Sequence, residues 1–116
     1  MFNVIIVGGD NIEDKKKFFT KCVYYLKPKV ESGEQIRILT IGEESVLMFA
    51  EKAHIETKQY ICDWKKYGNG AINQRNREIM KDADAIIYFG TSNKDLDYLY
   101  NYAKIKNKLM RRALEN

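Results

Sequence analysis

Four short apolar runs, separated by stretches with helical periodicity, constrain the fold of this chain most. The runs are Phe2–Val7, Ile36–Ile41, Gln59–Cys62 and Ala85–Phe89, and their β-branched and aromatic composition predicts strands. Strands that alternate with helices form right-handed βαβ units, which place the strands in a parallel sheet with helices on both faces. We therefore predict an α/β fold, a Rossmann-like three-layer α/β/α sandwich with a mainly parallel sheet of four to five strands.

The stretches between the runs predict the helices. Asp10 provides an N-cap with the acid Glu13 three residues later, and Pro28 is expected to end the helix that follows. Lys108–Leu114 either extends the last helix or forms a fifth, edge strand. The third helix is predicted over residues 73–81 with modest amphipathicity, and the second is capped near Glu44 or Ser45. The apolar stripes of the others are Ile12, Phe18, Phe19, Cys22, Val23 and Leu26 in the first helix, Val46, Phe49, Ala50 and Ala53 in the second, and Leu96, Leu99, Tyr100 and Ala103 in the fourth.

Composition sets the class of protein. With 116 residues, one proline, 45% hydrophobic and 31% charged residues, the chain fits a single globular domain over residues 1–116. No apolar run approaches the roughly 20 residues that cross a bilayer, and no export signal follows Met1, so we expect a cytoplasmic protein. Cys22 and Cys62 are expected to be reduced thiols, and with the single His54 they match no zinc pattern. We predict neither a metal nor a cofactor.

Several polar loops are expected at the carboxyl ends of the strands, the edge of such a sheet where ligands bind. Glycine at the start of a helix lets the backbone N–H groups approach a phosphate, although any tight turn between a strand and a helix also requires glycine. The nucleotide fingerprints of P-loop and NAD-binding proteins are absent. The candidate loops contain Gly8, Gly9 and Asp10 after the first strand, Gly42, Glu43 and Ser45 after the second, residues 63–73 after the third, and Gly90, Thr91 and Ser92 after the fourth.

The third loop and the helix after it carry the most distinctive residues. Trp64 and Tyr67 could stack on a base, or Trp64 could plug the end of the sheet. Asn76 falls on the apolar side of its helix, where an unpaired amide costs about 1–3 kcal/mol, so it should cap a neighbouring loop or bind a ligand. Arg75 near a helix N-terminus indicates an anionic partner, either a local carboxylate or a bound phosphate.

Three segments of the chain are residues 62–68 (CDWKKYG), 75–80 (RNREIM) and 83–89 (ADAIIYF). Together they resemble the YspA-type (DUF2493) branch of the SLOG superfamily. The resemblance runs along the whole chain and is most specific over residues 60–90. It implies a Rossmann-like domain that binds a nucleotide or a nucleotide derivative of the ADP-ribose or NAD type. It also implies that Asp63, Trp64 and Tyr67 form one wall of the site, while Arg75 and Asn76 meet phosphate or ribose.

The chain departs from that family pattern in two loops. Glu43 and Glu44 stand where the family carries a glycine-rich segment, and only Gly90 remains of the glycine-rich turn after the fourth strand. Our leading hypothesis is therefore a small nucleotide-binding protein. The alternatives are a phosphoribohydrolase, a single-strand nucleic-acid binder suggested by the lysines and tyrosines, and an interaction module. The enzyme would use Arg75 for the phosphate with Asp97 or Glu43 as the carboxylate, and the interaction module would use Tyr98, Tyr100 and Tyr102 as a homodimer face.

Overall fold

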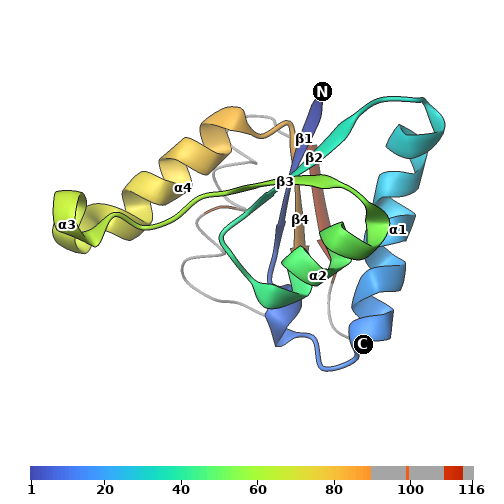
Figure 1. Ribbon diagram of the computed structural model, residues 1–116, viewed down its shortest axis with the longest axis horizontal. Coiled ribbons are helices and arrows are strands. Elements are labelled where there is room, and N and C mark those ends of the chain that lie inside the picture. Colours follow the sequence, from blue (N-terminus) through green and yellow to red (C-terminus); the bar gives the residue numbers. More distant parts are fainter. Residues whose placement is uncertain (90–98, 100–108, 114–116) are drawn as a thin grey trace.

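A computed structural model describes residues 1–89, 99 and 109–113 and has a five-stranded, all-parallel sheet (Figure 1). The strand order is β3-β2-β1-β4-β5, which is the order of doubly wound Rossmann-like sheets. The α/β prediction is confirmed, and of the two alternatives for Lys108–Leu114 the structure has the edge strand. The strands are β1 (Phe2–Val7), β2 (Ile36–Thr40), β3 (Glu56–Gln59), β4 (Ala85–Phe89) and β5 (Leu109–Ala113).

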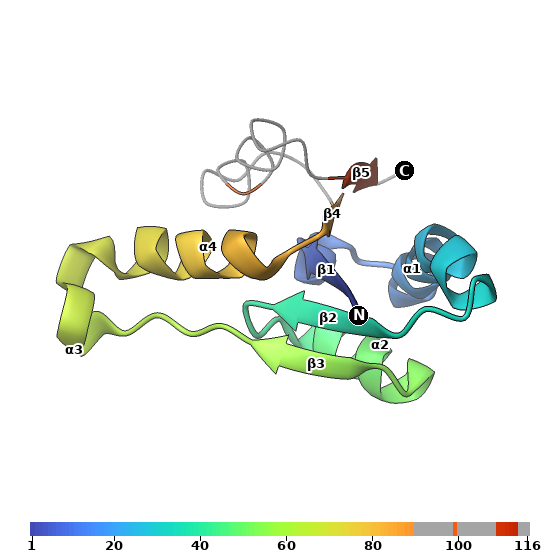
Figure 2. The same cartoon turned by 90° about the horizontal axis from the view of Figure 1, so that it is seen from above.

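Helices cover both faces of the sheet. Figure 2 shows the helices α1 (Lys15–Glu31) and α2 (Glu44–Ala53) on one side and α4 (Ala71–Asp82) on the other. A short helix, α3 (Trp64–Tyr67), and two single 3₁₀ turns, η1 (Gly9–Asn11) and η2 (Gly68–Gly70), complete the described elements.

Two apolar cores lie between these layers. Alternate residues of a strand face opposite sides, so β1 contributes Val4 and Ile6 to one core and Ile5 and Val7 to the other. Because both faces of β1 and β4 are covered, their sequences are continuous apolar runs, which is why their bounds were predicted correctly. The first core adds Phe18, Cys22 and Leu26 of α1 and Val46, Phe49 and Ala50 of α2, and the second adds Ile79 and Met80 of α4 together with Tyr60 and Leu99.

The first helix differs from its prediction at both ends. Its N-cap is Asp14, whose carboxylate accepts a hydrogen bond from the Lys17 N–H at 3.2 Å, because η1 takes up the residues around Asp10. Pro28 does not end the helix, which continues to Glu31: a proline on the exposed side removes one backbone hydrogen bond without crowding the core. Val23 is 54% exposed and so does not belong to the buried stripe.

The predicted third strand was displaced by three residues. The strand is Glu56–Gln59 rather than Gln59–Cys62, and all four of its side chains are exposed. An edge strand in solvent shows no apolar pattern, so the neighbouring apolar run was mistaken for it. Within that run Tyr60 continues the pairing through an N–H donated to the Thr40 carbonyl at 2.9 Å, whereas Ile61 is 71% exposed. The helix predicted over residues 73–81 corresponds to α4, which spans Ala71–Asp82.

The remaining sequence predictions have the following outcomes. Cys22 is buried, Cys62 is half-buried, and both are free thiols as predicted. His54 is exposed at the C-cap of α2 with a φ of 56°. No helix in the described part of the chain has both the length and the apolar character needed to span a bilayer. The predicted helix over residues 96–103 lies outside the described residues, except for the helical and buried Leu99.

Candidate functional site

The loops after β1 and β2 come together, as predicted, and each places a carboxylate on the backbone of the other. The Glu43 carboxylate accepts hydrogen bonds from the Gly8 N–H at 2.7 Å and from the Asp10 N–H at 3.1 Å. In return, the Asp10 carboxylate accepts the Ser45 N–H at 2.9 Å and so caps the N-terminus of α2. A phosphate at these loops would therefore have to displace a carboxylate from the backbone donors.

The two carboxylates have opposite electrostatic environments. Burial is the largest influence on Glu43 and raises its pKa, although the N–H groups of Asp10 and Gly8 oppose the rise. Burial also acts to raise the pKa of Asp10, but hydrogen bonding by Ser45 and the nearby charge of Lys15 outweigh it, so that this pKa is lowered. The surroundings of Asp10 therefore stabilise its ionised form, whereas burial disfavours the ionised form of Glu43.

Two glycines allow this close packing. Gly8 has a φ of +87°, and a Cβ atom there would lie 2.0 Å from the carbonyl oxygen of Phe89 in β4. At Gly9 a Cβ would lie 2.5 Å from the Ser45 hydroxyl oxygen and 2.6 Å from the ring of Phe18. Glycine is required at both positions for reasons of packing, independently of any phosphate.

The third candidate loop and the start of the helix after it, residues 63–78, do not lie beside these two loops. After β3 the chain leaves the sheet and forms α3 at the far end of α4, away from η1 in both views (Figures 1 and 2). Asp63 contributes locally, because its carboxylate accepts the Lys66 N–H at 3.1 Å and caps α3. The structure therefore divides the predicted site into two separate places.

A groove of about 730 Å³ lies between α3 and the first turns of α4, and we call it the aromatic groove. Trp64 is 56% exposed, so it does not plug the end of the sheet, and Tyr67 is 36% exposed. Two large rings are thus available to a ligand. The groove is lined by Ile61, Cys62, Asp63, Trp64, Lys65, Lys66, Tyr67, Ala71, Gln74, Arg75 and Glu78.

Arg75 and Asn76 form a pair at this groove. Asn76 is buried, as predicted, and its side-chain oxygen accepts hydrogen bonds from Nε and Nη2 of Arg75 at 3.3 and 3.1 Å. In the described part of the chain Arg75 forms no ion pair, so the local carboxylate expected as one of its two possible partners is not found. The contact with Asn76 orients the guanidinium through a neutral side chain.

Some predicted residues cannot be placed. Gly90, Thr91, Ser92 and the catalytic candidate Asp97 lie outside the described residues, as do Tyr98, Tyr100 and Tyr102. Glu43, the other carboxylate considered for catalysis, is held by the backbone of the first loop and does not line the groove that contains Arg75.

The sequence prediction missed a second groove, between α1 and α2. Val23 was assigned to the core, although it lines this groove with Phe19 and Met48. A sign was present in the sequence, since the stripe assigned to the first helix was wider than one buried face requires.

The comparisons with known proteins identify no relative of this chain. Searches of protein-family models, of curated proteins and of solved structures found no match to this chain. Within the described residues, no group of three or more His, Cys, Asp or Glu side chains is placed to hold a metal ion. The functional proposal therefore depends on the geometry of the chain's own residues.

Proposed function

We propose that the protein binds a nucleotide-type small molecule in the aromatic groove, with ADP-ribose and NAD as the ligand class. One observation carries the proposal: an arginine that forms no ion pair with a carboxylate among the described residues lies in the same groove as an exposed tryptophan. A nucleotide combines an aromatic base with phosphate, and these two groups require a ring and a fixed cation.

The groove can satisfy both requirements. A base stacked on Trp64 or Tyr67 gains about 1–3 kcal/mol, the usual range for stacking on an aromatic side chain. The guanidinium of Arg75 presents a planar fork to phosphate oxygens, and Lys65 and Lys66 add charge beside it. The volume of about 730 Å³ lies within the range of small-molecule sites.

The SLOG resemblance supports the same assignment, because it attributes this segment to the ligand wall. The proposal differs from the family expectation in one respect. Phosphate recognition relies on side chains here, since the backbone donors of the first two loops already bind Glu43 and Asp10.

The single tryptophan provides a direct assay, because Trp64 lies in the groove itself. We expect ADP-ribose and AMP to change its fluorescence on titration. Adenosine and ribose 5-phosphate, which lack the phosphate or the base, should bind more weakly. No change with any of these compounds, together with no heat of binding in calorimetry, would refute the proposal.

Variants test the roles of the residues. Arg75→Ala should weaken AMP binding about tenfold or more, because hydrogen bonds to charged groups contribute about 1.5–3 kcal/mol. Arg77→Ala is the matched control, an exposed arginine on the same helix outside the groove. By calorimetry, Trp64→Ala should also weaken binding, whereas Tyr24→Ala, which removes an exposed ring from α1, should not. Equal losses in Arg75→Ala and Arg77→Ala would indicate a general charge effect and contradict the assignment.

A further inference from the structure

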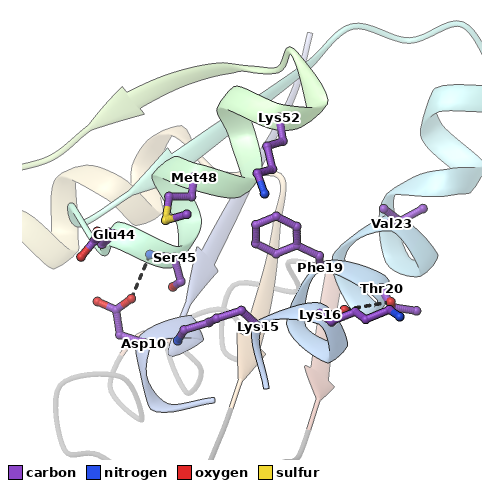
Figure 3. A pocket seen from close by; sticks show the side chains of 10 residues that line it. All are labelled: Asp10, Lys15, Lys16, Phe19, Thr20, Val23, Glu44, Ser45, Met48 and Lys52. Atoms are coloured by element: carbon purple, nitrogen blue, oxygen red, sulfur yellow. Dashed lines mark hydrogen bonds between the residues drawn. The ribbon is translucent and has the colours of Figure 1, made fainter. Parts of the chain in front are cut away.

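We infer a second ligand site in the groove between α1 and α2, for a hydrophobic anion with a single carboxylate, such as a medium-chain fatty acid. This groove has a volume of about 890 Å³ and is lined by no residue of the aromatic groove (Figure 3). We call it the α1–α2 groove. Its lining residues are Asp10, Lys15, Lys16, Phe19, Thr20, Val23, Glu44, Ser45, Met48 and Lys52.

The centre of the groove is apolar, and its aromatic ring is held in place by neighbouring rings. Phe19 is half-buried and packs edge-on against Phe18 and Phe49, with ring centroids 5.8 and 5.5 Å away, so its ring is fixed. Val23 of α1 and Met48 of α2 flank the groove and are 54% and 45% exposed. Exposed apolar side chains are common singly, but two that flank a half-buried ring in one groove mark a surface suited to an apolar group.

Two lysines supply the charge for the head of the ligand. Lys52 extends from α2 with its ammonium 5.2 Å from the centre of the Phe19 ring, while Lys16 lines the groove from α1 with its side chain beside Thr20 (Figure 3). Neither forms an ion pair within the described residues. Lys15 is different, because its ammonium donates to two backbone carbonyls, those of Gly9 at 3.0 Å and Ile12 at 2.7 Å.

The acidic residues limit the charge of the ligand. Asp10 and Glu44 lie together at the end of the groove next to the N-terminus of α2 (Figure 3). Asp10 is held by Ser45, and both acids would repel a second negative group. One carboxylate over Phe19 can contact Lys52 and leave its chain on Val23 or Met48, while Lys16 adds positive charge to the groove.

Calorimetric titration with decanoate tests this site. We expect saturable binding of one molecule, no binding of acetate, which lacks the chain, and weaker binding of decyltrimethylammonium, which has the same chain and the opposite charge. Trp64 fluorescence should stay constant, because Trp64 lies in the other groove. Equal affinity for the two decyl compounds, or binding only to anionic lipid vesicles, would overturn the inference.

Variants locate the bound decanoate. Lys16→Met and Lys52→Met keep the aliphatic stem and should each weaken binding up to about fivefold, as expected for a partly exposed ion pair. Val23→Asp should weaken it further by placing a negative charge beside the chain. Lys27→Met is the control, an exposed lysine of the same helix outside the groove. If Lys27→Met matches the other lysine variants, the site is refuted, while the proposal for the aromatic groove is unaffected.

Discussion

The contact between Gly8 and β4 makes the sharpest stability prediction, because the cost of adding one methyl group at Gly8 can be worked out in two parts. Alanine at a φ of +87° adopts a left-handed conformation, which costs about 1–2 kcal/mol. Its Cβ would also lie 2.0 Å from the Phe89 carbonyl oxygen, which is backbone and cannot rotate away. Overpacking of this kind costs about 1–3 kcal/mol more. We therefore expect Gly8→Ala to lower the free energy of unfolding by about 2–5 kcal/mol.

Gly33→Ala is the matched control. Gly33 has a similar φ of +79°, but a Cβ there would have no heavy atom within 4 Å, so only the conformational cost applies. The difference between the variants isolates the clash and should be about 1–3 kcal/mol. The melting temperature of Gly8→Ala should therefore lie below that of Gly33→Ala, by roughly 4 °C for each kcal/mol of this difference. Far-UV circular dichroism is the suitable readout, because Trp64 is exposed on α3 and reports poorly on the core. Equal destabilisation of the two variants would refute the close approach of Gly8 to the Phe89 carbonyl.

Two further predictions concern pH. The hydroxyl of Tyr60 donates to Asp82 and is the largest influence lowering the pKa of that carboxyl, so Asp82 stabilises the fold above about pH 4 and loses this effect as the pH falls. Tyr60→Phe should cost about 1 kcal/mol at pH 7 and less in acid, and a constant penalty in urea denaturation from pH 7 to 3 would contradict this. Because burial raises the pKa of Glu43, the wild type should lose stability relative to Glu43→Gln as the pH rises above about 4, and a pH-independent difference would exclude that effect.

The sequence predicted those parts of the fold that are determined by burial on both sides. The bounds of Phe2–Val7 and Ala85–Phe89 were predicted to the residue. Their alternate side chains enter the two opposite cores, so that each strand is a continuous apolar run. The prediction failed at β3, where solvent on the open edge removes the apolar signal. It also failed at Pro28, where the helix continues for three residues beyond a proline on its exposed face.

The candidate site was predicted less completely, because its geometry depends on turns rather than on periodicity. The position of Asn76 on the buried side of its helix followed from spacing, but its pairing with the adjacent Arg75 depends on side-chain rotamers that a sequence does not specify. The parallel sheet correctly implied that the first two loops would meet. That the Glu43 carboxylate would reach the N–H groups of Gly8 and Asp10 could not be predicted, since it depends on the left-handed turn at Gly8.

These carboxylates also determine how a nucleotide could be recognised at all. In a site built from backbone N–H groups, phosphate binding survives most side-chain substitutions, because the donors belong to the main chain. Here the N–H groups of Gly8 and Asp10 already bind Glu43, and the N–H of Ser45 binds Asp10. In the binding mode that we propose, phosphate recognition depends instead on the side chain of Arg75, so a single substitution should remove most of the affinity. The sensitivity of binding to Arg75→Ala thus distinguishes the aromatic groove from a conventional phosphate loop even before the natural ligand is known.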